Sequence, residues 1–183
     1  MRNTLVFAAL LFLHLSLSSF SAWADPRQGE FAGHQLGAAL PKGRADAEDL
    51  LPDGLLRARA QVTPDLQDFE HVELIATPKS RTIVSIWAVR NFRSPSDAAA
   101  EFESQAALLN SLYHSACPPL EWEDGVRASF VCAAPTHYAM TVEVVAEQDG
   151  TATLRFGLRL DRLSENLASI QKLIDAETGK AKE

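Results

Sequence analysis

HYAMTVEVVAEQDGTATLRFGLRLD, residues 137–161, is the stretch that decides the fold, because apolar and polar residues alternate through both of its halves. Such alternation is typical of strands that bury one face and leave the other polar. The aspartate and glycine between the halves indicate a tight turn. The stretch therefore predicts an antiparallel hairpin whose apolar face is formed by Met140, Val142, Val144, Ala146, Leu154, Phe156, Leu158 and Leu160.

The register of this hairpin follows from the same pattern. A two-residue loop would set apolar residues opposite polar ones, and a slip of one residue turns every side chain to the other face. A three-residue loop over 148–150, with its glycine left-handed, instead pairs Val144 with Leu154. It also sets Glu143 opposite Arg155, an ion pair of the kind that adds a few tenths of a kcal/mol. We therefore expect the three-residue loop.

A second hairpin is expected over residues 69–92. Residues 69–77 alternate, residues 78–81 read as a turn, and residues 82–92 are rich in β-branched and aromatic side chains. The run 82–92 is apolar on both faces, which suits a central strand that is covered on both sides. Trp87 is accordingly expected in the core.

Two amphipathic helices complete the pattern. Ser94 is a suitable N-cap, with Pro95 at the first helical position and Asp97 in the first turn. One apolar stripe then recurs at helical spacing through Phe102, Ala106, Leu109, Tyr113 and Ala116, and a second through Leu163, Leu167, Ile170 and Ile174. Each stripe is expected to lie against a sheet.

The expected order of elements is ββαββββα, which predicts an α+β fold. We expect a two-layer sandwich, with an antiparallel sheet of about five to seven strands and two amphipathic helices. This domain would span residues 67–176. A loop-rich N-terminal arm, 25–66, would precede it, with a short strand near 31–36 and a helical turn near 45–51, and a flexible tail, 177–183, would follow it.

Residues 1–24 have the pattern of a secretory signal peptide. Arg2 precedes an apolar run over 5–17, and the segment ends in Ala22-Trp23-Ala24. The alternative is an uncleaved membrane anchor, but the run is shorter than the roughly 20 apolar residues that a spanning helix needs. The sequence therefore predicts cleavage after Ala24 and a periplasmic or secreted protein.

Cys117 and Cys132 are the two cysteines of the chain, and they flank a turn signal at 124–125. A redox pair usually has two residues between its cysteines, and a zinc site needs further ligands. In an oxidising compartment a disulfide is the expected state. Trp122 lies beside the turn, where it could anchor a partner or cap the edge of the sheet, and the sequence leaves both alternatives open.

Catalytic and cofactor-binding motifs are not found in the sequence, so no cofactor, metal ion or catalytic residue is predicted. His71 and Glu73 are expected on a solvated strand face. Arg155 and Arg159 share the polar face of their strand, where they could form a carboxylate cradle or a solvated face with Glu143 paired to Arg155. The histidines of residues 25–183 have no metal-ligand spacing; they are His34, His71, His114 and His137.

These features favour a small, soluble, exported protein that is not an enzyme: a binding, inhibitory or envelope-accessory module. The formal net charge of −7 argues against nucleic acid as a partner, so the expected partner is a protein or envelope component. The alternative is a periplasmic hydrolase that uses scattered histidine and carboxylate residues. That alternative requires two or more of the histidines to converge with carboxylates in a cleft.

Overall fold

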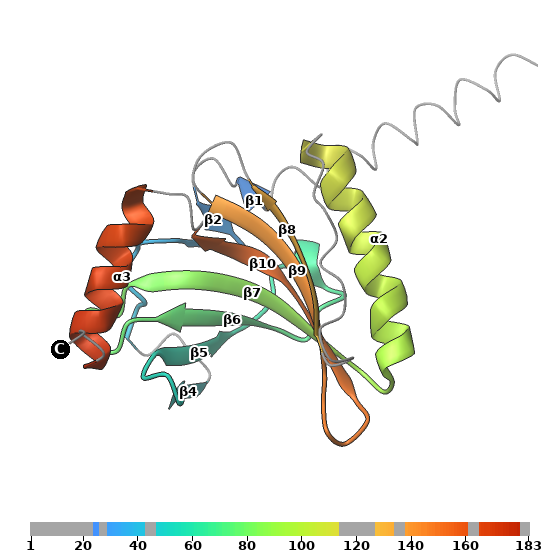
Figure 1. Ribbon diagram of the computed structural model, residues 1–183, viewed down its shortest axis with the longest axis horizontal. Coiled ribbons are helices and arrows are strands. Elements are labelled where there is room, and N and C mark those ends of the chain that lie inside the picture. Colours follow the sequence, from blue (N-terminus) through green and yellow to red (C-terminus); the bar gives the residue numbers. More distant parts are fainter. Residues whose placement is uncertain are drawn as a thin grey trace, which may run out of the picture.

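The computed structural model (Figure 1) describes residues 24–25, 29–42, 47–113, 127–133, 138–160 and 165–179. These residues form an antiparallel seven-stranded sheet, a three-stranded sheet and two α-helices, which confirms the predicted α+β class. The large sheet has the order β4-β5-β6-β7-β10-β9-β8. Its strands are β4 (Ala47–Leu50), β5 (Leu56–Ala60), β6 (His71–Ala76), β7 (Ile83–Phe92), β8 (Arg127–Ala133), β9 (Tyr138–Ala146) and β10 (Ala152–Leu160).

The remaining elements lie around this sheet. The small sheet contains β1 (Ala24–Asp25), β2 (Glu30–Phe31) and β3 (His34–Gln35), and a 3₁₀ turn spans Pro64–Leu66. Figure 1 shows helices α2 (Pro95–Tyr113) and α3 (Glu165–Thr178) at opposite ends of the large sheet. Three strands follow α2 among the described residues, and the residues that would carry a fourth, 114–126, lie outside them.

The β9–β10 hairpin has the predicted register. Val144 pairs with Leu154, and Glu143 pairs with Arg155, whose Nη1 lies 3.6 Å from Glu143 Oε1. Gly150 is left-handed, with φ of 85°, which closes the three-residue loop. The predicted loop and ion pair are both confirmed.

One face of the large sheet carries the core, because alternate residues of five neighbouring strands turn the same way. Its buried side chains include Ala58, Val72, Leu74, Ile86, Ala88, Met140, Val142, Val144, Leu154, Phe156 and Leu158. Ala98 and Ala106 of α2 join this cluster, and Phe102 packs against it. The predicted start of α2 is also confirmed, since the backbone N of Asp97 donates to Ser94 Oγ at 3.3 Å.

The segment around 45–51 is strand rather than the expected helical turn. Residues Ala47–Leu50 pair with β5, which in turn pairs with β6, so the loop-rich N-terminal arm contributes two strands to the large sheet. The pairing is supported by Arg57, which donates to both carboxylate oxygens of Asp49 at 3.0 and 2.6 Å. The expectation was wrong because a short polar segment gains its strand conformation from its partner strand and not from its own pattern.

The first part of the N-terminal arm packs on the core. Phe31 is fully buried, and its ring meets Phe156 edge-on at 5.6 Å between centroids. Ala32 and Gly33 are both left-handed, with φ of 54° and 73°. A type I′ turn, which joins two strands through a two-residue loop, requires a positive φ at both of these positions. The strand expected near 31–36 is therefore a hairpin formed by β2 and β3.

Helix α3 continues two residues into the expected flexible tail of 177–183. Glu177 Oε2 accepts hydrogen bonds from the backbone N of Lys79 at 2.7 Å and of Ser80 at 2.9 Å. Burial acts to raise the pKa of Glu177, but the hydrogen bonds from Ser80 and Lys79 together outweigh it and lower that pKa. The end of α3 is thus attached to the β6–β7 turn, which the sequence pattern of the tail did not indicate.

Gly157 is required by the close approach of β10 to β7. A Cβ atom at this position would lie 2.0 Å from the carbonyl oxygen of Ile86 on the neighbouring strand. We therefore expect Gly157→Ala to lower the free energy of unfolding by about 3 kcal/mol, because the backbone of a central strand must move. Urea denaturation measures the change.

Gly150→Ala is the matched control, because a Cβ there would meet no atom within 4 Å and the cost is only that of a left-handed alanine. That cost is about 1 kcal/mol. Equal losses for the two variants would contradict the proposed strand contact at Gly157.

Candidate functional site

The face of the large sheet opposite the core carries a cluster of charged residues around Glu73. Only 4% of Glu73 is exposed. Four basic groups lie within 4.0 Å of its carboxylate: His71 Nε2 at 3.4 Å, Arg57 Nη1 at 3.8 Å, Arg155 Nη2 at 3.9 Å and Arg59 Nε at 4.0 Å. The expected solvated face is therefore wrong at Glu73, which is buried among basic side chains. The missed signal is the pair of arginines on β5, a strand that the sequence pattern did not reveal.

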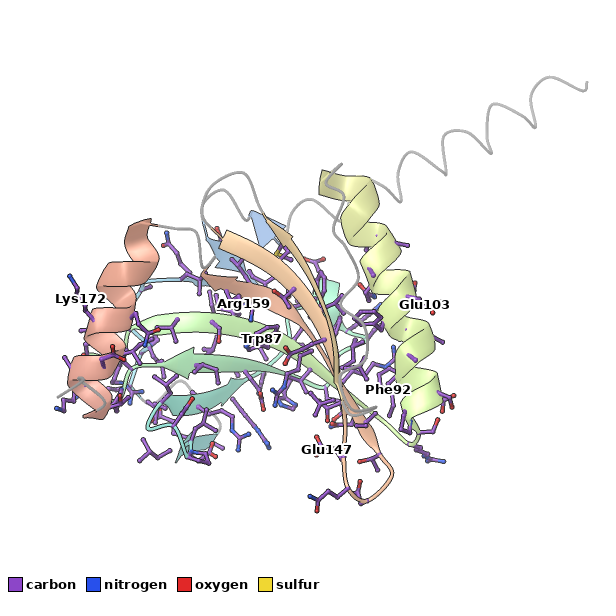
Figure 2. The ribbon with its side chains drawn as sticks, viewed as in Figure 1. Trp87, Phe92, Glu103, Glu147, Arg159 and Lys172 are labelled. Carbon is purple, nitrogen blue, oxygen red and sulfur yellow. The ribbon has the colours of Figure 1, made fainter. Side chains whose placement is uncertain are left out.

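Arg155 joins Glu73 to a second buried carboxylate. Its Nη1 and Nη2 lie 3.6 Å from Glu143 and 3.9 Å from Glu73, so two negative charges already balance it. Arg159 is half-buried four residues further along the strand on the same face, and Figure 2 labels it next to Trp87 on the central strands. Arg155 and Arg159 thus share a face as predicted, and the structure assigns Arg155 to an ion-pair network.

The centre of this face is closely packed. Trp87 is 8% exposed, which agrees with the expected core position, and its Nε1 donates to Ser85 Oγ at 3.0 Å. Among the described residues, Thr141 Oγ1 and Arg155 Nε are buried without a hydrogen-bond partner. Both atoms lie on the same face of the sheet as the ion pairs.

Several residues of interest lie outside the described part of the chain. They are Cys117, Trp122, His114 and His137. Cys132 lies on β8 opposite Met140 of β9. The disulfide and the two alternatives for Trp122 therefore stay predictions.

The two histidines that the structure describes do not converge. His71 contacts Glu73 on the polar face, whereas His34 lies over the apolar face with Leu74. No group of three or more His, Cys, Asp or Glu residues within the described ranges could hold a metal ion. Among the same residues, no helix has both the length and the apolar content needed to cross a membrane.

A cavity of about 280 Å³ lies on the apolar face, beneath residues 33–41, which we call the cover segment. It is bordered by the cover segment and by residues of β5, β6 and β7, and it is partly open to solvent. The ten lining residues are Gly33, His34, Gln35, Ala38, Ala39, Leu40, Pro41, Ala60, Leu74 and Ile83. The sequence signal that could have indicated it is the run of small residues in GHQLGAALP, since glycine and alanine cannot fill the space above the sheet.

Backbone hydrogen bonds attach the cover segment to the start of β7. Gly37 N donates to Ile83 O at 2.8 Å, and Ile83 N donates to Ala38 O at 2.9 Å. Leu40 N donates to Arg81 O at 2.7 Å. The cover segment is therefore bonded to the start of β7 in the way that neighbouring strands are, along one side of the cavity.

Arg81 connects the cover segment to the edge of the large sheet. Its Nε donates to Leu40 O at 3.2 Å, and its guanidinium donates to both carboxylate oxygens of Glu48 on β4, at 3.0 and 2.6 Å. Arg81 is left-handed, with φ of 59°, an uncommon conformation for a residue with a side chain. Such strain persists where the surrounding contacts fix it.

The Arg81–Glu48 pair is sensitive to acid. The hydrogen bond from Arg81 lowers the pKa of Glu48, and the same bond raises the pKa of Arg81. Because the folded pKa of Glu48 is below its ordinary value of 4.5, the pair stabilises the fold above that value. This contribution is lost as the pH falls through the lowered pKa.

Removing the Arg81 side chain should loosen the cover segment. We expect Arg81→Ala to raise the hydrogen-exchange rates of the Gly37 and Leu40 amides by about tenfold or more, because charge-assisted hydrogen bonds are lost while the left-handed backbone is kept. Hydrogen exchange read by NMR measures these two amides.

Arg93→Ala is the control, since Arg93 follows the opposite end of β7 and is exposed. Unchanged exchange at Gly37 and Leu40 in Arg81→Ala, or the same increase in Arg93→Ala, would show that Arg81 does not hold the cover segment.

Comparison with known proteins does not assign a family. No family model matches the chain, and neither a curated protein nor a solved structure matches it. The function is therefore argued from the described residues themselves.

Proposed function

We propose that this protein is an exported, non-enzymatic binding module that holds a small, mainly apolar ligand beneath its cover segment. The observation that carries the proposal is the cavity of about 280 Å³ between residues 33–41 and the apolar face of the sheet. Ligand sites are typically concave and mostly apolar, with a few polar groups, and begin at about 300 Å³. The cavity is close to that size and has that composition.

The cavity supports binding rather than catalysis. His34 is the one side chain with an ordinary acid–base role among the ten lining residues. A hydrolase would need a second group, and His71 lies on the opposite face, beside a carboxylate that four basic groups surround. The periplasmic hydrolase is therefore the weaker alternative.

The proposed partner remains a protein or envelope component that supplies or receives the ligand. The outermost strand, β4, is the described surface that suits such a contact, because all four of its residues are exposed and Leu50 is 67% exposed. Leu50 is the one large apolar side chain that is exposed among the described residues. The possible contacts of Trp122, Arg155 and Arg159 belong to the same proposal.

Export is tested by the mass of the purified protein. If the chain is secreted as we propose, intact mass spectrometry without reductant gives the mass of residues 25–183 less two hydrogens, because the signal peptide is removed and Cys117 and Cys132 form a disulfide. Asp25 and its pairing with Glu30 are kept in such a chain.

Treatment with a thiol-reactive reagent before and after reduction is the control, because it shows whether the loss of two hydrogens comes from a disulfide between Cys117 and Cys132. A full-length mass would contradict cleavage, and two thiols that react without reduction would contradict the disulfide.

Filling the cavity should abolish ligand binding. Benzene is a suitable first probe, because apolar cavities of about 150 Å³ already bind it. We expect benzene to shift the NMR signals of Leu40, Leu74 and Ile83 in the unmodified protein. In Ala60→Leu these shifts should be lost, since the larger side chain occupies the space.

Ala107→Leu is the matched control, because Ala107 is exposed on α2 and adds the same atoms away from the cavity. It should bind benzene like the unmodified protein. Absence of shifts in the unmodified protein, or equal shifts in Ala60→Leu, would overturn the proposed function.

A further inference from the structure

The last turn of α3 is attached to the large sheet through the β6–β7 turn, residues 77–82. Glu177 Oε2 accepts hydrogen bonds from the backbone N of Lys79 at 2.7 Å and of Ser80 at 2.9 Å. None of residues 171–178 of the helix is buried, so burial of side chains contributes little to holding them. Hydrogen bonds to a carboxylate are stronger than neutral ones, and Glu177 therefore contributes much of the attachment.

The same turn holds the cover segment. Arg81 Nε donates to Leu40 O at 3.2 Å, and Leu40 N donates to Arg81 O at 2.7 Å. Directly after the turn, Ile83 O accepts a hydrogen bond from Gly37 N at 2.8 Å. The β6–β7 turn thus binds α3 through residues 79–80 and the cover segment through the residues that follow.

A set of close contacts fixes the shape of this turn. Thr77 is fully buried, and its Oγ1 accepts from the backbone N of Thr82 at 3.0 Å and lies 2.6 Å from Ser80 Oγ. Arg81 is left-handed, with φ of 59°. This conformation is uncommon for a residue with a side chain and persists where surrounding contacts impose it.

Loss of the bonds to Glu177 would remove part of what imposes this shape. Residues 79–80 directly precede Arg81, so a change in their backbone angles redirects both the carbonyl group and the side chain of Arg81. Both of these groups bond to Leu40, and the cover segment would lose the two bonds together. Hydrogen-bonded elements of this kind change between discrete arrangements rather than by continuous deformation.

We propose that docking of α3 on the β6–β7 turn controls the cover segment. With Glu177 bound to the turn, the segment is held against β7, and with α3 released, the segment separates from the start of β7. Seven of the ten residues that line the cavity belong to the cover segment, so its position decides the shape of the cavity. The coupling itself goes beyond the proposed function and needs no ligand, whereas its effect on ligand binding rests on that function.

Glu177→Ala tests the coupling by hydrogen exchange, read by NMR without a ligand. We expect the amides of residues 79–80 to exchange faster, because their acceptor is lost. We expect the amides of Gly37 and Leu40 to exchange about fivefold or more faster as well, which is the lower end of the usual coupling between two sites. This increase should exceed any change at Val144 in the middle of the sheet, whose amide reports global opening.

Asp175→Ala is the matched control. Asp175 lies near the same end of α3, but its Oδ1 accepts from Gln171 Nε2 within the helix at 2.8 Å. It should leave the exchange of Gly37 and Leu40 unchanged. Glu177→Gln keeps an oxygen that can accept from the two amides of the turn, and we expect a smaller increase than in Glu177→Ala.

The coupling is wrong if Gly37 and Leu40 keep their exchange rates in Glu177→Ala, whether or not residues 79–80 change. It is also wrong if Val144 shows the same increase, since Glu177 would then act only on global stability. Benzene tests the effect on binding separately, and its affinity should fall about fivefold or more in Glu177→Ala. Equal affinity would show that the cover segment does not control the cavity, and a lack of binding to the unmodified protein would overturn the proposed function alone.

Discussion

The register of the β9–β10 hairpin is the constraint on which the rest of the structure depends. With Val144 opposite Leu154, every alternate side chain of both strands turns to one face, and a shift by one residue would reverse them all. That face then receives α2 and the first part of the N-terminal arm. The opposite face receives Glu143 and Arg155, which continue the charge cluster around Glu73. The core and the ion-pair network are thus on opposite faces of the sheet because the register of one hairpin fixes which of its residues join each.

The two faces differ in what they can bind. On the polar face, the two buried carboxylates of Glu73 and Glu143 lie beside basic side chains that balance their charge, and replacing such a buried ion pair by apolar residues often costs little net stability. On the apolar face, a partly open cavity lies between the small residues of the cover segment and the sheet. A concave, mainly apolar surface of this size beside a hydrogen-bonded segment is consistent with a ligand site.

The sequence predicts those parts of the fold whose residues are neighbours in the chain. The β9–β10 register follows from alternation on both sides of one glycine, and the start of α2 follows from Ser94 and Asp97. Strand β4 could not be predicted, because its polar residues are held by Arg57 and Arg81 from other elements. The cavity could not be predicted either, because Ala60, Leu74 and Ile83 come together with the cover segment only through the sheet. The small residues of 33–41 are the one local sign of it.

A crystal structure of the protein under xenon pressure tests the central claim most directly, because xenon occupies apolar cavities without needing a specific head group. The account predicts xenon between Leu40, Leu74 and Ile83, with the cover segment still bonded to Arg81 and Ile83. A structure in which side chains of the protein fill this space, and xenon is not found beneath the cover segment, would contradict it.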